Sequence, residues 1–597
     1  MPDWKNLESI LIADIGRVTT KVALVDHVSG QFRFVASGTM ATTAAPPDAD
    51  VAIGIRNAIR QIETCTGRRF LTNDGQLILP ERPGVEGVDA FTAVTSAPQP
   101  LRVAIAGLSR EISLAAAVRA INGTHATVVA TLALDETGGR WMPARIPISD
   151  DATNQSHAPA LLDPSVIAAE TLARSNPEVI LLVGGIDGGA TTALYDIANL
   201  LAAIVASRDE NKRPVVIFAG NTAARPQIAN RIGPVTQLRV VDNVCPTLER
   251  ENLSPLQYDL ETLYAEKKIL WLPGLNALSS WMPGQQVIPS SRAFQNVVRY
   301  LGRRYGLGVL GADIGSAATT IVSARGDSYT RVVRADLGVG SNLERVIQTA
   351  GLERLLDWLP IERNADDALV HYLNQALHPR TLPATREETY LTLAAAHAAL
   401  AIGAQGLDTD GHDLIVLTGG LCVHTSNLGA LALLALDTMQ PHGIFTLAVD
   451  SLGIAPALGG LAQLNSEAAA CAIENDGFLT LGTVIAPISE NREGQIDLRV
   501  HIQPAVGGAI NLEVTHGSLE LIPLESGQKA SIEIHPVGRV DLPQARRGFF
   551  KAEIEGGALG LMIDARGRPI TLPSDKEKRR AKVHQWYWDL GSEGANG

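Results

Sequence analysis

Ala13-Asp-Ile-Gly16 ends an apolar run near the start of the chain, and the same four residues return as Ala312-Asp-Ile-Gly315. Each copy follows a run typical of a β-strand. Each also precedes hydroxyl residues and a second strand-like run, Val22–Val25 in the first copy and Ile321–Val322 in the second. Two strand–turn–strand units with the same turn predict two similar lobes that face each other. A single copy would equally be an ordinary strand-ending turn, because aspartate and glycine are common in turns.

The residue types in this turn suit a phosphate group. Glycine lets the backbone approach a phosphate closely, and backbone N–H groups and hydroxyls can then hold its oxygens. Aspartate repels phosphate, so Asp14 and Asp313 would act through Mg²⁺ or its waters, or would orient an attacking water. Lys21 could meet a phosphate as a point charge. The pair of turns therefore predicts a magnesium triphosphate held between two lobes.

Three sets of residues are predicted to build this site. The catalytic residues, which would also bind Mg²⁺ through water, are Asp14 and Asp313. The residues expected to hold the nucleotide phosphates are Gly16, Thr19, Thr20, Lys21, Gly315, Ser316, Thr319 and Thr320. Two further glycine turns lie at strand ends, where ligands gather in α/β sheets; they contribute Gly419 and Gly420, and Gly184 and Gly185 with Asp187. Taken singly, each of these two turns is more simply a strand-to-helix connection.

Composition limits the classes of function. At roughly 100–200 residues per domain, a chain of 597 residues predicts three or four lobes. The net charge is −13 and no basic stripe is visible, which argues against nucleic acid as a partner. The four cysteines lie far apart, so neither a disulfide framework nor a zinc site is expected. No apolar run approaches the ~20 residues that span a bilayer, and we expect a soluble, cytoplasmic protein with no membrane partner.

Alternating strands and helices predict an α/β fold with parallel or mixed sheets. Neither GxxxxGK[ST] nor a GxGxxG that opens onto a helix occurs, so two other common nucleotide sites are not supported. We expect a first lobe over residues 1–306 with an inserted helical segment, a second lobe over residues 307–475, and a small antiparallel β domain with a charged tail over residues 476–597. The basic and aromatic tail is expected to be solvated, with membrane binding as the alternative.

In their order and wide spacing, these motifs resemble those of the superfamily that contains actin, sugar kinases and heat-shock chaperones. Asp14-Ile-Gly16 resembles its first phosphate motif, Asp313–Thr319 its second, and Leu417-Thr-Gly-Gly420 its adenosine motif. The resemblance implies the actin-like ATPase fold, with duplicated ribonuclease H-like lobes around a nucleotide cleft, and ATP with Mg²⁺ as the ligand. Arg17 and Val18 depart from the small residues usual in the first motif. Arg17 could add a cation at the phosphate, or its bulk could distort the loop.

Within that superfamily the chain looks most like the glutamate mutase L family, also called MutL and unrelated to the mismatch-repair protein of that name. The resemblance covers roughly residues 9–465 and is carried by Ala106-Gly-Leu108, Leu181–Gly189, Phe218-Ala-Gly-Asn221 and Asp313–Thr320. It implies an accessory or reactivating chaperone for an adenosylcobalamin-dependent mutase or aminomutase, and a subunit of that enzyme would be the partner.

Two other functions share this fold. A small-molecule kinase would need an aspartate base near the γ-phosphate, and Asp187 is the best candidate. A scaffold of the cell-division type would bind ATP but assemble rather than catalyse, and that class normally carries a membrane-binding amphipathic helix. For the chaperone, one expectation is ATP hydrolysis coupled to opening of the lobes, and the other is ATP binding without hydrolysis.

Overall fold

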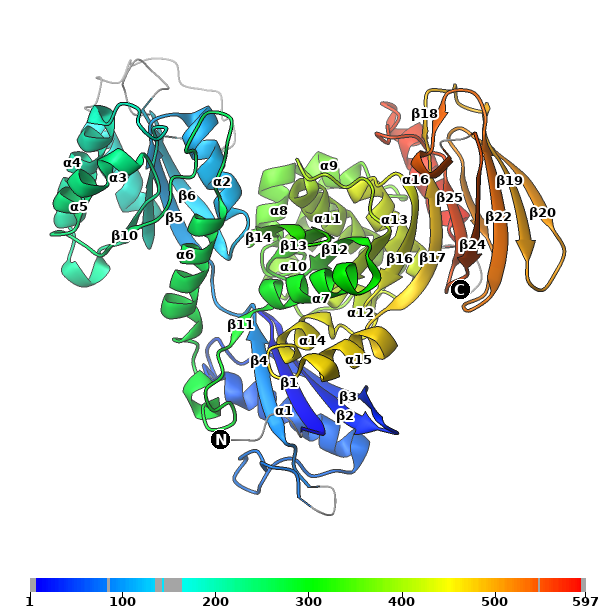
Figure 1. Cartoon of the computed structure of the whole chain (residues 1–597), viewed down its shortest axis with the longest axis horizontal. Coiled ribbons are helices and arrows are strands. Elements are labelled where there is room, and N and C mark those ends of the chain that lie inside the picture. Colours follow the sequence, from blue (N-terminus) through cyan, green and yellow to red (C-terminus); the bar gives the residue numbers. More distant parts are fainter. Residues whose placement is uncertain (1–6, 83–85, 135–141, 144–163, 546–547, 592–597) are drawn as a thin grey trace. The chain divides into compact units, whose positions relative to one another are not determined.

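The computed structural model describes residues 7–82, 86–134, 142–143, 164–545 and 548–591 (Figure 1). The chain forms two compact units. The larger unit combines Met1–Pro98 with Leu272–Gly597, and the smaller unit is Gln99–Trp271.

The first sheet of the larger unit carries the Asp14 turn. Its strands, in order across the sheet, are β11 (Ile288–Pro289), β4 (Ala90–Thr95), β1 (Ser9–Ile15), β2 (Thr19–Val28) and β3 (Gln31–Ala41). Helix α1 (Val51–Thr66) packs on β2 and β3. Asp50 caps the start of α1 by accepting a hydrogen bond from Ala52 N, and the left-handed Gly67 ends it.

The second sheet carries the Asp313 turn and has eight strands. They are, in order, β14 (Ser328–Arg334), β13 (Thr319–Arg325), β12 (Gly308–Ile314), β15 (Leu414–Thr418), β16 (Gly443–Val449), β17 (Leu479–Ala486), β25 (Gly560–Asp564) and β21 (Leu519–Ile522). The antiparallel run β12–β13–β14 repeats β1–β2–β3, and β15 lies parallel to β12 as β4 lies parallel to β1. The predicted duplication of an α/β lobe is therefore confirmed.

Helices cover both sheets of the larger unit. Helix α7 (Ser290–Tyr305) packs on β12 and β13, and α14 (Ala455–Leu461) packs on α7, β1 and β4. Because these two helices touch strands of both sheets, they join the two lobes through one apolar core. Helix α15 (Ser466–Asp476) packs on β3 and α14. Further helices that follow the second hairpin are α8 (Leu343–Ala350), α9 (Leu352–Leu356), α10 (Ala365–Leu377), α11 (Arg386–Ala404), α12 (Gly420–His424) and α13 (Leu428–Met439).

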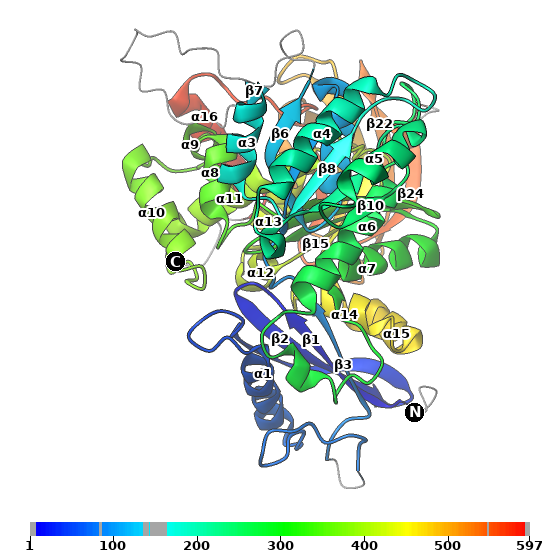
Figure 2. The ribbon, with the colours of Figure 1, turned by 90° about the vertical axis from the view of Figure 1, so that its left-hand side faces the viewer.

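The smaller unit is a six-stranded, mainly parallel sheet between helices (Figure 2). Its strands, in order, are β10 (Leu238–Val240), β9 (Val215–Phe218), β8 (Val179–Val183), β5 (Leu101–Gly107), β6 (Ala126–Ala133) and β7 (Met142–Pro143). One face is covered by α3 (Pro164–Ser175), α4 (Thr192–Ala206) and α5 (Arg225–Ile232), which share an apolar core with the sheet. Helices α2 (Ala115–Ile121) and α6 (Ser254–Tyr264) lie on the other face (Figure 1).

The C-terminal stretch contains antiparallel sheets, as predicted. One has the order β20 (Ile510–Thr515), β19 (Ile496–Pro504), β22 (Lys529–Pro536) and β24 (Phe550–Glu555), and a second pairs β18 (Ile488–Ser489) with β23 (Val540–Asp541). Strands β17, β21 and β25 of the same stretch extend the second sheet instead. The lobe boundaries expected at residues 306 and 475 stay a prediction.

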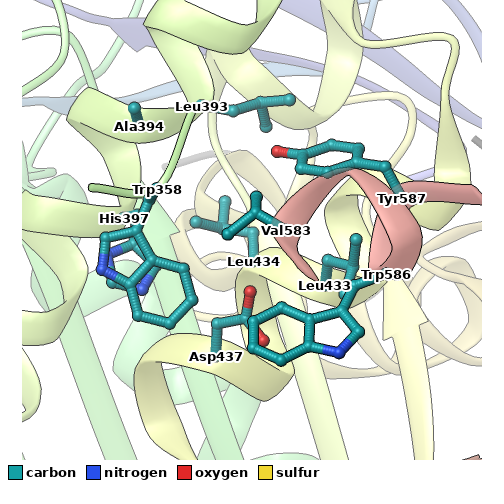
Figure 3. A pocket seen from close by; sticks show the side chains of 10 residues that line it. All are labelled: Trp358, Leu393, Ala394, His397, Leu433, Leu434, Asp437, Val583, Trp586 and Tyr587. Atoms are coloured by element: carbon teal, nitrogen blue, oxygen red, sulfur yellow. The ribbon is translucent and has the colours of Figure 1, made fainter. Parts of the chain in front are cut away.

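The expectation of a solvated tail is wrong. Residues Lys576–Asp589 form α16, and Val583, Trp586 and Tyr587 are buried against α11 and α13 (Figure 3). These positions share one face of a helix, so an apolar stripe lies among the basic residues. Several of those basic residues meet acids of the same unit, as Arg579 meets Asp357. Within the described ranges, no helix is both long and apolar enough to span a bilayer.

The burial of α16 predicts that replacing its two tryptophans by alanine will lower the free energy of unfolding by different amounts. Trp586 is 3% exposed and Trp588 is 57% exposed. Trp586→Ala should lower the free energy of unfolding by about 3–5 kcal/mol, because it leaves a cavity in the second-lobe core. Trp588→Ala should change it by less than about 0.5 kcal/mol. Urea unfolding of the two variants measures both values, and equal costs would contradict the packing of α16.

Candidate functional site

The two hairpin turns close in the same way. In each, the glycine N–H, of Gly16 or Gly315, donates to the carbonyl oxygen three residues further on at 2.9 Å. The first turn keeps this geometry with Arg17 and Val18 at its tip, so the bulk of Arg17 does not distort it. Arg17 Nη1 donates to a backbone carbonyl oxygen, that of Ala97, at 2.8 Å.

The predicted phosphate-binding hydroxyls differ in exposure. Thr19 is exposed, whereas Thr20, Thr319 and Thr320 are buried. The Thr20 hydroxyl lies 2.9 Å from another threonine hydroxyl, and the Thr319 hydroxyl donates to a backbone carbonyl at 2.9 Å. The Ser316 hydroxyl accepts from a backbone N–H at 3.0 Å. Among these hydroxyls Thr19 is therefore the most accessible to a ligand, and the assignment of all of them to phosphate stays a prediction.

The two predicted aspartates lie in one electrostatic cluster. Asp14 is on β1 directly opposite Lys21 of β2 in the hairpin register. Its Oδ1 accepts a hydrogen bond from the Ser290 hydroxyl, at the start of α7, at 2.8 Å. Asp313 stands at the equivalent place on β12, and its charge interacts with that of Asp14. The two hairpins thus bring their carboxylates close enough for their charges to interact, and their shared role in catalysis stays a prediction.

A third carboxylate, which sequence reasoning missed, completes the cluster. Asp450 follows β16, is fully buried, and accepts a hydrogen bond from the Thr418 hydroxyl at 2.7 Å. Thr418 is the last residue of β15 and precedes the Gly419 turn. The sequence held a signal for Asp450, since it follows a strand-like run as the other two aspartates do. No comparable signal pointed to Ser290.

Burial and crowding shift the pKa of each charged group. Burial, with added repulsion from Asp14 and Asp450, raises the pKa of Asp313 to about 7. Burial also raises the pKa of Asp14, against the opposing effects of the Ser290 hydrogen bond and Lys21. Burial raises the pKa of Asp450 as well, and it lowers the pKa of Lys21 against the attraction of Asp450 and Asp14.

Three interacting carboxylates, with Lys21 acting on Asp14 and Asp450, make a site that favours an added cation. Oxygen ligands of this kind are those that Mg²⁺ prefers, and Mg²⁺ usually keeps several waters in protein sites. Among the described residues, no three His, Cys, Asp or Glu side chains lie close enough together to hold a metal ion directly. The donor set fits Mg²⁺ bound through water beside Asp14 and Asp313, and that role stays a prediction.

The Gly419 turn presses directly against the second hairpin. Its φ is +109°, and a Cβ at this position would lie 2.3 Å from the Ile314 carbonyl oxygen and 2.9 Å from Asp313 Oδ1. Only glycine tolerates that backbone conformation and that approach. The third predicted motif, Gly419 with Gly420, is therefore in contact with the Asp313 turn.

The remaining predicted residues belong to the smaller unit. Gly184, Gly185 and Asp187 follow β8, and Asp187 is exposed. The Asp187 carboxylate accepts hydrogen bonds from Thr222 N at 2.9 Å and from Asn243 Nδ2 at 3.1 Å. Burial opposes ionisation, but these hydrogen bonds outweigh it and lower the pKa of Asp187. A carboxylate with a lowered pKa is a weaker base.

The sequence model of the MutL protein family matches residues 10–476. The chain belongs to the MutL family. The resemblance inferred from the motifs is thereby confirmed. The match includes both hairpins, the Gly419 turn, Asp450 and the smaller unit. Protein MutL of Clostridium tetanomorphum is 24% identical over 469 residues, which cover 71% of this chain and 88% of the relative.

Solved structures are similar at a low level. A glycerol dehydratase reactivase has a TM-score of 0.29 and 13% identity, over 77% of this MutL-family chain and 100% of its own. Component A of the (R)-2-hydroxyglutaryl-CoA dehydratase of Acidaminococcus fermentans has a TM-score of 0.27 and 8% identity, over 77% and 99%. The xylulose kinase of Bifidobacterium adolescentis has a TM-score of 0.26 and 13% identity, over 77% and 94%. Likeness at this level says nothing about activity.

The raised pKa of Asp313 predicts how a substitution changes stability with pH. The folded protein keeps the Asp313 proton up to about pH 7, whereas the unfolded chain loses it near 3.8. Between these values the folded state binds more protons, so this carboxyl destabilises the fold as the pH rises. Relative to the unsubstituted protein, Asp313→Asn should therefore gain stability from pH 5 to pH 8, by roughly 2 kcal/mol.

Urea unfolding at several pH values measures this gain. Asp187→Asn serves as a control, because the pKa of Asp187 is lowered and its substitution should bring no such gain. Parallel pH profiles for Asp313→Asn and the unsubstituted protein would contradict the burial and crowding of the Asp313 carboxyl at this site.

Proposed function

We propose that this chain is an ATP-binding accessory protein, of the reactivating chaperone type, for an adenosylcobalamin-dependent mutase or aminomutase. One observation carries the proposal. In a member of the MutL family, Asp14 and Asp313 from two matched hairpins meet in one cluster with Lys21. This arrangement suits a magnesium triphosphate, whose metal waters would be held by carboxylates of both lobes while Lys21 meets a phosphate oxygen.

The residues of the cluster would have different roles in binding the phosphate and in its hydrolysis. Bound Mg²⁺ would neutralise phosphate charge and supply ordered waters. Asp14 would hold those waters from the first lobe, while Lys21 meets a phosphate oxygen. Asp313 would orient the attacking water, and its pKa of about 7 suits a group that accepts a proton near neutral pH. Positioning of this kind is most of what phosphoryl transfer requires of a protein.

Helices α7 and α14 would transmit a change at the nucleotide site into movement of the two lobes. Ser290 is the first residue of α7 and contacts Asp14, and α14 packs on α7. A change at Asp14 therefore acts on helices that touch both sheets. We propose that nucleotide closes the lobes and that its loss reopens them, so that the motion exchanges something bound to the partner enzyme.

The other two functions receive less support. A kinase needs a strong base beside the γ-phosphate, and the pKa of Asp187 is lowered by its hydrogen bonds. A cell-division scaffold needs an amphipathic helix free to meet a membrane, and the apolar stripe of α16 is buried in the second-lobe core.

Substitution of each aspartate should separate binding from hydrolysis. Asp14→Asn should weaken magnesium ATP about tenfold by calorimetry, because a ligand of the metal waters is lost. Asp313→Asn should leave that affinity within about threefold and slow phosphate release about 100-fold. Asp327→Asn, at the exposed turn between β13 and β14, is the control and should match the unsubstituted protein. Equal behaviour of all three variants would exclude the Asp14–Asp313 cluster as the nucleotide site.

Reactivation of an inactivated mutase tests the proposed partner enzyme. A glutamate mutase or aminomutase inactivated by a damaged cobalamin should regain activity with this chain, magnesium ATP and fresh adenosylcobalamin. It should not regain activity when Asp313→Asn replaces the chain. Transfer of phosphate from ATP to a small molecule, without any reactivation, would favour the kinase instead.

A further inference from the structure

The turn after β16 touches three parts of the candidate site at once. Asp450 begins the turn and accepts a hydrogen bond from Thr418, beside the Gly419 motif. The carbonyl oxygen of Leu452 accepts a hydrogen bond from Lys21 Nζ at 2.5 Å. Lys21 comes from the first hairpin, so this turn of the second lobe holds a side chain of the first.

The turn is itself held firmly. The Asp450 carboxylate accepts hydrogen bonds from Ile454 N at 3.1 Å and from Ala455 N at 2.8 Å, at the start of α14. Helix α14 packs closely on α7, because Gly459 lacks a Cβ, which would lie 1.8 Å from the Ala293 carbonyl oxygen. The carboxylate and the Leu452 carbonyl are therefore fixed relative to the helix pair that joins the two lobes.

Lys21 needs such a support to act on a phosphate. Its side chain is long and flexible, with about 2 kcal/mol of rotamer entropy to lose. Burial disfavours its charged form, and among the opposing charges Asp450 acts more strongly than Asp14. An ammonium group has three N–H donors. One bond to Leu452 can therefore fix its position and still leave donors for a ligand.

Gly453 shows how closely the turn fits the lysine. Its φ is +63°, and a Cβ at this position would lie 2.5 Å from Lys21 Nζ and 2.6 Å from Val423 Cγ2. Any side chain here would push the ammonium group away from its place.

We infer that Asp450 is a positioning residue: together with the turn Asp450–Gly453, it holds the Lys21 ammonium group beside Asp14 for contact with a nucleotide phosphate. Asp450 touches no phosphate itself, because two negative charges repel, and it acts through Lys21. This inference rests on the proposed function and adds a residue to the site.

A double-mutant cycle tests the inference with magnesium ATP and, separately, with adenosine. Lys21→Met should weaken magnesium ATP by 10- to 100-fold, the usual range for a hydrogen bond to a charged group. Asp450→Asn should weaken it about tenfold, but less than twofold in the Lys21→Met background. Adenosine carries no phosphate, so its affinity should stay within twofold in every variant. A merely structural role of Asp450 would weaken both ligands and would act equally in both backgrounds.

A pair of glycine substitutions keeps the test valid if Asp450→Asn folds poorly. Gly453 and Gly306 have similar φ values, +63° and +68°, but a Cβ at Gly306 would meet nothing within 4 Å. Both alanine variants therefore carry the same backbone strain. Gly453→Ala should weaken magnesium ATP about tenfold, whereas Gly306→Ala should leave it unchanged.

The outcomes separate the inference from the proposed function. If the unsubstituted protein fails to bind magnesium ATP, both are wrong. If it binds, and Gly453→Ala matches Gly306→Ala, the inference alone is overturned. The inference alone is also overturned if Asp450→Asn weakens binding of magnesium ATP as much in the Lys21→Met background as in the unsubstituted protein.

Discussion

Three carboxylates lie close together with one ammonium group, Asp450 fully buried and Asp14 and Asp313 half-buried, and elements from both lobes of the larger unit hold them. Removing charges from water costs several kcal/mol per ion unless partners compensate. Here Lys21 attracts Asp14 and Asp450 but does not offset their burial, so the pKa of all three carboxyls is raised and that of the lysine is lowered. A cluster that opposes stability in this way is typical of functional sites.

The surrounding backbone holds this cluster in place from several sides. Each hairpin supplies one aspartate one residue before its strand ends, and the Gly419 turn comes within contact distance of Asp313. Helices α7 and α14 supply Ser290 and the backbone N–H groups that bind Asp450. Because α7 touches strands of both sheets and α14 packs on α7, β1 and β4, the charged cluster and the connection between the lobes are built from the same elements.

The stretch after residue 476 lies outside the family match, yet it contributes to the second lobe. Strands β17, β25 and β21 continue the sheet that begins with the Asp313 hairpin. Helix α16 then buries Trp586 and Tyr587 between helices of that lobe. This stretch therefore shares part of the second-lobe core, while its four-stranded sheet packs on an apolar core of its own.

The sequence alone determined the repeated hairpins, the α/β class, the family and the pairing of Asp14 with Asp313, because these depend on local signals. An apolar strand, an aspartate and a glycine turn can be read within a few residues, and a repeat can be found by comparing two such segments. The contact of Ser290 with Asp14, the place of Asp450 in the cluster and the partners of the apolar face of α16 were decided only by the tertiary structure. Their roles depend on partners far away in the chain, and no local pattern states which distant element will remove a side chain from water.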